Sequence, residues 1–327
     1  MKAMVRSFTL LLLAMALSMT VTAAKWRVNN SGVPANFTSV QVAVDSPGVL
    51  SGDTVYLESS VISYGTLTLT KTLVLIGPGY FLGENDSTQA NKASAIVGTT
   101  NFNGGSEGSV ITGITFNSLV FAQTNNLLFK RNSIFSFYCQ ANGSNIAIVQ
   151  NYIGSLWIVD GSQNIIISNN IFSMLDAGNY CLYMYGASSA TITNNIFQDN
   201  QIVANSTYRN NISTAPAGYS KDVFSSSNST IENNIGASTQ YASFTGNLSN
   251  VDMSTVFACW ADCTGYSTDG RWILKSGSPA LGYGYGSVDC GVYGGATPYV
   301  KSGLPTVPAI WLLDVNGLNV TVKAKSH

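Results

Sequence analysis

The sequence predicts an all-β protein whose short strands coil into a solenoid, and three observations lead to this prediction. Asparagines recur at a spacing close to 19 residues, with an apolar or aromatic residue three places before each. Between them lie short alternating runs such as NIAIV and TIT, which are typical of strands rather than helices. Only 9% of the residues are charged, against about 25% in an average domain, so uncharged polar side chains must supply solubility.

Residues 1–24 are predicted to be a secretory signal peptide. Two basic residues precede an apolar run over 8–21, and the small residues at 21–24 suit cleavage on either side of Ala24. A membrane anchor is the alternative, but the run is shorter than the ~20 apolar residues that a span needs. We therefore expect a mature chain that begins near Ala24 or Lys25, lacks a transmembrane span, and is secreted or held at the cell surface.

Residues 53–250 are the predicted solenoid. If each repeat makes one coil, strands of neighbouring coils pair about 4.8 Å apart and equivalent residues stack along the axis. An asparagine tolerates the unusual backbone angles of a turn, and its amide can bond to the asparagine of the next coil. The repeat thus predicts an amide ladder with a structural rather than a catalytic role. Its members are spaced 19, 19, 25, 16 and 23 residues apart: Asn132, Asn151, Asn170, Asn195, Asn211 and Asn234.

The repeated phrases ISNNIF at 167–172 and ITNNIF at 192–197 resemble the coils of the pectate-lyase-like superfold. This resemblance implies a single-stranded, right-handed parallel β-helix. It says little about function, because the same fold carries lyases, hydrolases, epimerases, adhesins and phage fibres.

The two ends of the chain also resemble the ends of such proteins. Residues 39–58 resemble the entry to such solenoids, where a short amphipathic helix caps the first coil, and residues 25–52 are the predicted N-terminal cap. The helix should run from Ser39 to Asp45 and cover the first coil with all or some of three valines: Val40, Val42 and Val44. Residues 298–327 are similar to the ends of secreted β-helix proteins from Bacteroidetes, and residues 251–327 are the predicted C-terminal coils and capping segment. Material after Ser254 should cover the last coil.

Five cysteines in an exported chain suggest disulfide bonds. Cys259 and Cys263 can bridge each other, or either can pair with Cys290. Cys139 and Cys181 fall two coils apart, about 9.6 Å along the axis, which exceeds the ~7 Å limit for bridged Cα atoms. They also alternate to opposite sides of their strands, so we expect two free thiols, with Cys139 in the core.

Charge and motifs exclude several classes of function. The net charge is -1 and the 15 Lys and Arg residues are scattered singly, so nucleic acid is not an expected partner. The chain contains no P-loop, dinucleotide fingerprint or nucleophile elbow. Its only histidine is the last residue, and no metal or cofactor is expected.

An aromatic surface is the strongest candidate site. The second strands of three successive coils read SFYCQ, SLWIV and CLYMY, and strand alternation places Tyr138, Trp157 and Tyr183 outward, flanked by Gln140 and Tyr185. Exposed aromatic faces suit the apolar faces of pyranose rings, while amides suit sugar hydroxyls. The same alternation predicts six inward residues: Phe137, Cys139, Leu156, Ile158, Leu182 and Met184.

Two segments of the chain could cover the aromatic surface. The loop at 173–180, or the C-terminal segment that carries Trp311, could cover it, which would leave it a purely structural role.

A catalytic role is the other alternative. Enzymes of this superfold degrade polysaccharides, and successive coils could bring Asp160 and Asp176 together, with Arg209 or Lys221 approaching from a neighbouring coil. The leading hypothesis is an exported, non-catalytic protein that binds a polysaccharide or surface glycan or acts in adhesion. The alternatives are a polysaccharide lyase or glycoside hydrolase, and a purely structural surface protein.

Overall fold

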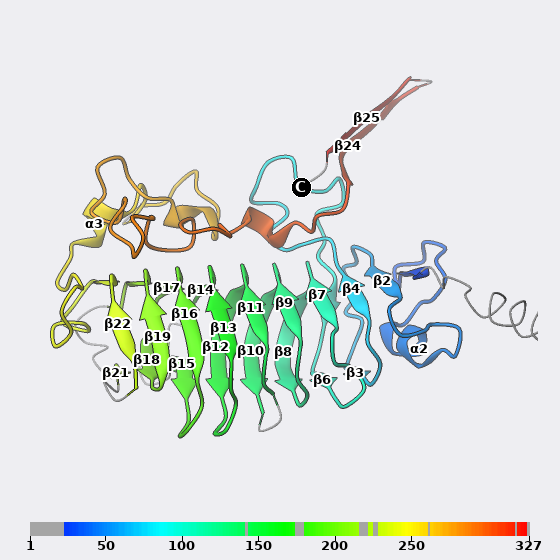
Figure 1. Cartoon of the computed structure of the whole chain (residues 1–327). Coiled ribbons are helices and arrows are strands. Elements are labelled where there is room, and N and C mark those ends of the chain that lie inside the picture. The colour runs from blue at the N-terminus through cyan, green and yellow to red at the C-terminus, as the bar shows by residue number, and fades with distance from the viewer. Residues whose placement is uncertain are drawn as a thin grey trace, which may run out of the picture.

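A computed structural model describes residues 23–140, 143–173, 180–215, 222–224, 228–260, 262–317 and 319–325. The chain winds into an elongated solenoid in which the strands of successive coils lie side by side (Figure 1). Every strand pair in its two large sheets is parallel, which confirms the predicted all-β parallel solenoid. Within the described residues, no helix is both long and apolar enough to cross a membrane.

One long face of the solenoid is a ten-stranded sheet to which each coil contributes a short strand. Four of these strands contain charged residues, which number five in all: Lys25, Arg27, Lys130, Arg209 and Glu232. In spatial order the strands are β1 (Lys25–Val28), β2 (Thr54–Leu57), β4 (Val74–Ile76), β7 (Val110–Thr112), β9 (Leu128–Lys130), β11 (Ala147–Val149), β13 (Ile165–Ser168), β16 (Ala190–Thr193), β19 (Ser206–Arg209) and β22 (Thr230–Glu232).

The rest of each coil forms a thirteen-stranded sheet, and none of its strands contains a charged residue. The three longest strands run through a bend, whereas later coils divide into two shorter strands. In chain order they are β3 (Leu67–Leu69), β5 (Ile96–Val97), β6 (Thr100–Phe102), β8 (Thr115–Ala122), β10 (Ser133–Cys139), β12 (Tyr152–Ile158), β14 (Ile171–Phe172), β15 (Tyr180–Met184), β17 (Ile196–Phe197), β18 (Asn200–Val203), β20 (Ile212–Ser213), β21 (Val223–Phe224) and β23 (Ile235–Gly236).

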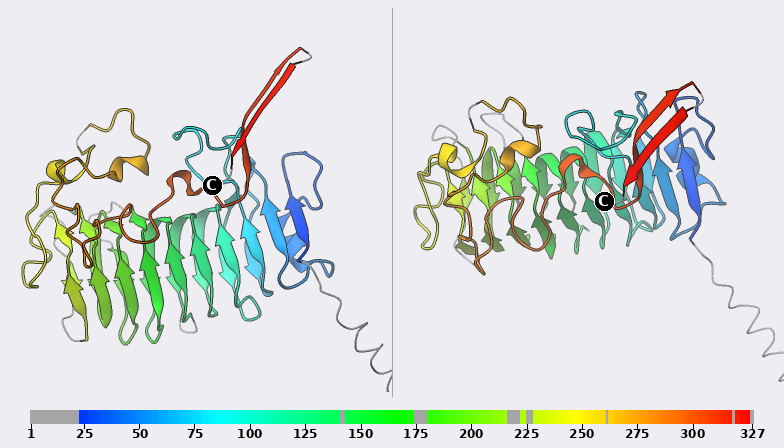
Figure 2. Two further views of the ribbon diagram at one scale, coloured as in Figure 1. Left: turned by 45° about the horizontal axis from the view of Figure 1, so that its top comes forward. Right: turned by 90° about the horizontal axis from the view of Figure 1, so that it is seen from above.

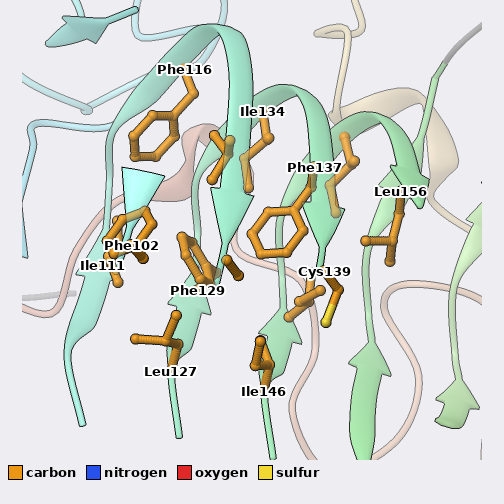
Figure 3. Packing of buried hydrophobic residues seen from close by; sticks show 14 of the residues in the cluster. Phe102, Ile111, Phe116, Leu127, Phe129, Ile134, Phe137, Cys139, Ile146 and Leu156 are labelled. Carbon is orange, nitrogen blue, oxygen red and sulfur yellow. The ribbon is translucent and has the colours of Figure 1, made fainter. Parts of the chain in front are cut away.

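The core fills the space between the sheets with stacked apolar side chains (Figure 3). Phe129 lies edge-on to both Phe102 and Phe137, with ring centres 5.0 and 4.7 Å apart. The predicted inward residues are confirmed, since each is at most 3% exposed: Phe137, Cys139, Leu156, Ile158, Leu182 and Met184.

The predicted amide ladder is confirmed. In each step one side-chain oxygen accepts two hydrogen bonds from the preceding asparagine; Asn151 Oδ1, for example, accepts from the backbone N and Nδ2 of Asn132 at 2.8 and 3.1 Å. Asn247 adds a seventh member that the repeat did not predict. All six predicted members are fully buried: Asn132, Asn151, Asn170, Asn195, Asn211 and Asn234.

The unusual backbone angles belong to the residue before each ladder asparagine, not to the ladder asparagine itself. These preceding residues have φ between 55° and 60°, in the left-handed region that asparagine tolerates best among residues with a side chain. In each Asn-Asn doublet the first asparagine therefore adopts the left-handed turn conformation, and the second forms the ladder hydrogen bonds. The left-handed column consists of Arg131, Gln150, Asn169, Asn194, Asn210 and Asn233.

After the last coil the chain runs back along this left-handed column, as the orange segment in Figures 1 and 2 shows. We call residues 283–304 the return segment. Its backbone forms a hydrogen bond of 2.7 to 3.2 Å with the side chain of each column residue in turn. Asn210 Oδ1 accepts from Tyr285 N. The other five side chains donate to backbone carbonyls: Asn233 Nδ2 to Tyr283 O, Asn194 Nδ2 to Asp289 O, Asn169 Nδ2 to Val292 O, Gln150 Nε2 to Thr297 O, and Arg131 Nη1 to Leu304 O.

Both ends of the solenoid are covered. The predicted capping helix is confirmed as α2 (Val40–Asp45), with Ser39 as its N-cap; Val40 and Val44 are buried with Ala43, while Val42 is 59% exposed. Helical periodicity explains why only two of the three valines face the coil.

The other end is covered by α3 (Met253–Val256), whose two end residues share a buried cluster with Ile235 of β23. Beyond it lie two 3-10 helices, η1 (Gly270–Trp272) and η2 (Lys301–Gly303). The chain then ends in an antiparallel ribbon of β24 (Ala309–Asn316) and β25 (Asn319–Lys325) that projects from the solenoid (Figure 1).

Cys259 and Cys263 form a disulfide, while Cys139, Cys181 and Cys290 are free and buried. The expectation that Cys139 and Cys181 lie on opposite sides is wrong, because both side chains are fully buried. Strict alternation fails at the bend of the sheet, where two successive residues point inward, as in the pairs Ser136-Phe137, Ser155-Leu156 and Cys181-Leu182.

The three free thiols should be inert in the folded protein. Burial raises the pKa of both Cys139 and Cys290 to about 12, and only a thiolate attacks a disulfide reagent. With Ellman's reagent at pH 8 we expect no reaction in the native state and three thiols after unfolding in guanidinium without reductant. Five reactive thiols after unfolding would contradict the disulfide, and fast native labelling would contradict the burial.

Candidate functional site

Strand register brings the three predicted aromatic residues into one outward column. Tyr138 pairs with Trp157 across β10 and β12, and Trp157 pairs with Tyr183 across β12 and β15. Phe121 of β8 extends the column by one coil. We call Phe121, Tyr138, Trp157 and Tyr183 the aromatic strip. Sequence reasoning missed Phe121, because a bulge shifts β8 by one residue against β10.

The rings of the strip stack on one another along the solenoid axis. Tyr138 and Trp157 are nearly parallel, 7° apart with centres at 6.1 Å, and Trp157 and Tyr183 differ by 16° at 5.1 Å. The indole N–H of Trp157 donates inward to Ser155 Oγ at 3.2 Å. The predicted open faces are therefore partly covered by neighbouring rings, and the strip presents mainly a ridge of ring edges.

The residues predicted to flank the strip do lie beside it. Tyr185, at 40% exposure, tilts against Tyr183 with ring centres 4.3 Å apart and against Trp157 at 6.3 Å. Gln140 follows Cys139 on the other flank and is half-buried. Within the described residues, the hydroxyls of Tyr138 and Tyr183 have no hydrogen-bond partner, so both can bond to a ligand.

The outward column that contains the strip continues over eight coils without a charge. Register pairs link its members one by one, and the aromatic rings occupy the middle of the row. From one end to the other the column reads Thr68, Asn101, Phe121, Tyr138, Trp157, Tyr183, Ile202 and Val223.

The proposed covers of the strip do not both fall on described residues. Trp311 lies in β24, where the Lys323 ammonium is 5.2 Å from its ring centre, and the ribbon projects away from the solenoid in Figure 1 and in the left view of Figure 2. In the loop at 173–180, residues 174–179 lie outside the described part of the chain.

The structure separates the catalytic candidates that it describes. Asp160 is exposed in the turn between β12 and β13 and accepts a hydrogen bond from Ala187 N at 2.6 Å. Arg209 ends β19, at the opposite end of the strands in the ten-stranded sheet. Its guanidinium pairs with Glu232 at 2.7 Å and lies 4.2 Å from the ring centre of Tyr285. The other two candidates, Asp176 and Lys221, lie outside the described residues.

Two further carboxylates lie under the far end of the outward column. Asp199 and Asp222 directly precede β18 and β21, and Asp199 is fully buried. Burial raises the pKa of Asp222 to about 7, against the effect of a hydrogen bond from Gln201 N and with a further rise from the charge of Asp199. Near neutral pH Asp222 is thus partly protonated, which avoids two buried charges side by side.

A groove of about 870 Å³ lies at the N-terminal end of the solenoid. Outward residues of the first strands form one wall and residues 305–310 form the other. It is charged, since Arg27 and Glu58 pair within it. Sequence reasoning missed this groove because its walls come from opposite ends of the chain.

Within the described residues, no three His, Cys, Asp or Glu side chains come together to hold a metal ion. Comparison of the chain with protein-family models and with curated protein sequences finds no match.

Proposed function

We propose that this protein is exported and binds an uncharged glycan along the aromatic strip, at or outside the cell surface. The same proposal takes the solenoid as a right-handed β-helix of the pectate-lyase-like kind, acting without catalysis. One observation carries the binding proposal: four aromatic residues align on a sheet whose thirteen strands contain no charged residue.

The composition of this surface selects the class of ligand. Tyrosine and tryptophan offer an apolar body for sugar C–H groups together with polar edges for hydroxyls, and the amide of Gln140 can both donate and accept. A carboxylated glycan would lose water over these thirteen strands, whose described residues include no cation to pair with it, and this is costly. An uncharged glycan has no such penalty.

The direction of the strip selects the orientation of the ligand. Its four rings follow the solenoid axis over three steps of about 4.8 Å, roughly 14 Å in all. An extended glycan lying along the axis, across the strands, touches every ring at once. Binding should therefore strengthen with oligosaccharide length until the strip is filled.

The test is glycan binding by a Trp157→Ala variant. We expect its Kd for the best-bound neutral polysaccharide to rise about tenfold or more, which is 1.4 kcal/mol, because the central ring of the strip is lost. Stability should fall modestly, since each of two ring contacts contributes about 0.5–1.5 kcal/mol. Affinity electrophoresis and calorimetry against xyloglucan, β-glucan, starch, polygalacturonate and alginate provide the measurement.

Phe135→Ala is the matched control, since Phe135 is a 55% exposed aromatic residue on β10 outside the strip. It should bind like the wild type. Binding should also persist from low to high salt, because screening affects only charged partners. No binding to any glycan would refute the proposed function, whereas salt-sensitive binding to the two acidic polymers alone would refute the uncharged class. Assaying the same mixtures for new reducing or unsaturated ends tests the enzyme alternative.

A further inference from the structure

Asp53, which directly precedes β2, is a buried carboxylate with three neutral donors. It is 2% exposed, and its oxygens accept from Ala24 N at 2.7 Å, Trp26 Nε1 at 2.8 Å and Leu50 N at 2.9 Å. Although burial by itself raises the pKa of Asp53, the hydrogen bonds from Trp26, Leu50 and Ala24 hold it below its ordinary value. The group is therefore a buried anion at neutral pH.

No cation of the described residues forms an ion pair with Asp53, whose partners among them are all uncharged. The charge of Lys71 also lowers the pKa of Asp53, but its ammonium donates to the carbonyls of Ser46 and Val49 and not to the carboxylate. Lys25 is exposed and does not bond to the carboxylate. A buried carboxylate that no cation contacts is less favourable than a paired one, so the site can accept one positive group in contact with Asp53.

The missing charge can come from Ala24 itself. The carbonyl of Ala24 accepts from Thr54 N at 2.9 Å, so this residue begins the pairing of β1 with β2, while Ala23 is exposed. If Ala24 were the first residue, its nitrogen would be an α-ammonium in place of the amide that now lies 2.7 Å from Asp53 Oδ1.

We propose that the leader is cleaved between Ala23 and Ala24 and that the new α-ammonium forms a buried ion pair with Asp53. A signal peptidase of the export machinery hydrolyses this bond: water adds its hydroxyl to the Ala23 carbonyl, the C–N bond breaks, and the Ala24 amine takes up the protons. The proposal rests on the export part of the proposed function and is independent of glycan binding.

Cleavage at either neighbouring peptide bond would give an N-terminus that does not place its ammonium against the Asp53 carboxylate. Cleavage after Ala24 would remove the donor to Asp53 and the acceptor of Thr54 N–H. Cleavage before Ala23 would place the ammonium on an exposed residue, one residue before the nitrogen that contacts the Asp53 carboxylate. The leader leaves before the chain folds, so the fold does not guide the peptidase; it shows which product the sequence accommodates.

Mass spectrometry and N-terminal sequencing of the full chain, exported by a bacterial host, test the site of cleavage. We expect Ala24 as the first residue. A first residue of Ala23 or Lys25 would overturn this inference and leave the export proposal standing. Retention of the whole leader would overturn both.

A second experiment tests the ion pair on chains that begin at Ala24, one with a free and one with an acetylated amine. The acetyl group removes the charge and keeps an N–H donor. At pH 6 we expect the free amine to raise Tm by about 2 °C or more. Pairing raises the pKa of the amine above its unfolded value of about 7.7–8.0. The advantage should therefore be complete below pH 7 and vanish as pH rises through the higher folded pKa.

Asp53→Asn provides the matched background, in which acetylation should have no effect on Tm at any pH. Equal Tm values for the free and acetylated chains at pH 6, with Asp53 present, would overturn the ion pair.

Discussion

Replacing Asn170 by leucine should lower the free energy of unfolding by about 3 kcal/mol or more, because each buried polar group left unsatisfied costs roughly 1–3 kcal/mol. Asn170 Oδ1 accepts from Asn151 N and Nδ2 at 2.9 and 3.0 Å, and its own Nδ2 donates to Ile148 O and Asn195 Oδ1 at 2.7 and 3.1 Å. Leucine removes all four hydrogen bonds and offers water no path to the stranded groups.

Chemical denaturation with a fluorescence readout measures this loss. Asn117→Leu is the control, since Asn117 is exposed on β8 and the same substitution there should change stability by no more than about 0.5 kcal/mol. Equal midpoints for the two variants would mean that the ladder adds nothing to stability.

The ladder and the left-handed column show how one sequence phrase serves two purposes. Asn170 points into the coil and bonds along the axis, while Asn169 turns the backbone and holds the return segment through Val292 O and Gly294 O at 2.9 and 2.8 Å. Repetition of the phrase thus builds both the solenoid and a docking row for the C-terminal part of the chain.

The sequence was sufficient to predict the ladder, the inward residues and α2, because each depends on local periodicity. Stacking of coils forces equivalent residues into one row, so the spacing of Asn132, Asn151 and Asn170 determined their contacts. It could not assign the left-handed angle to the first asparagine of each doublet, since both asparagines tolerate that conformation. The return segment also has no periodicity, and only its contacts with distant coils fix its path.

For the candidate site, too, the sequence predicted which residues share a column but not how their side chains pack. Alternation placed Tyr138, Trp157 and Tyr183 in one column, but it could not predict that their rings stack, because ring orientation depends on rotamers and on the neighbouring coil. Phe121 was not predicted to belong to the column, because the bulge in β8 shifts its register against β10. Asp160 and Arg209 were grouped by the coils to which they belong, whereas the position of each within its coil places them at opposite ends of the strands.

Replacing Asp269 by leucine should cost about 3 kcal/mol or more, because hydrogen bonds to a charged group contribute about 1.5–3 kcal/mol each. Asp269 is fully buried and joins three segments of the chain. Its carboxylate accepts from Asn85 Nδ2 at 3.0 Å, Ser302 N at 2.6 Å and the Tyr299 hydroxyl at 3.3 Å. Without it, the end of the return segment keeps its direct hydrogen bonds to the loop around Asn85, from Asn85 Nδ2 to Ser302 Oγ and from Ser302 Oγ to Phe81 O, but loses the carboxylate that binds both sides.

The expected loss is local as well as global, so two measurements are needed. The denaturation midpoint reports the global change, and limited trypsin digestion reports the local one, since Lys301 is exposed next to Ser302 and should be cut faster in the variant. Asp86→Leu is the control, because Asp86 is exposed beside Asn85 and makes no hydrogen bond to the described residues. A variant at Asp269 that resists trypsin and unfolds like the control would show that the return segment is held without the Asp269 carboxylate.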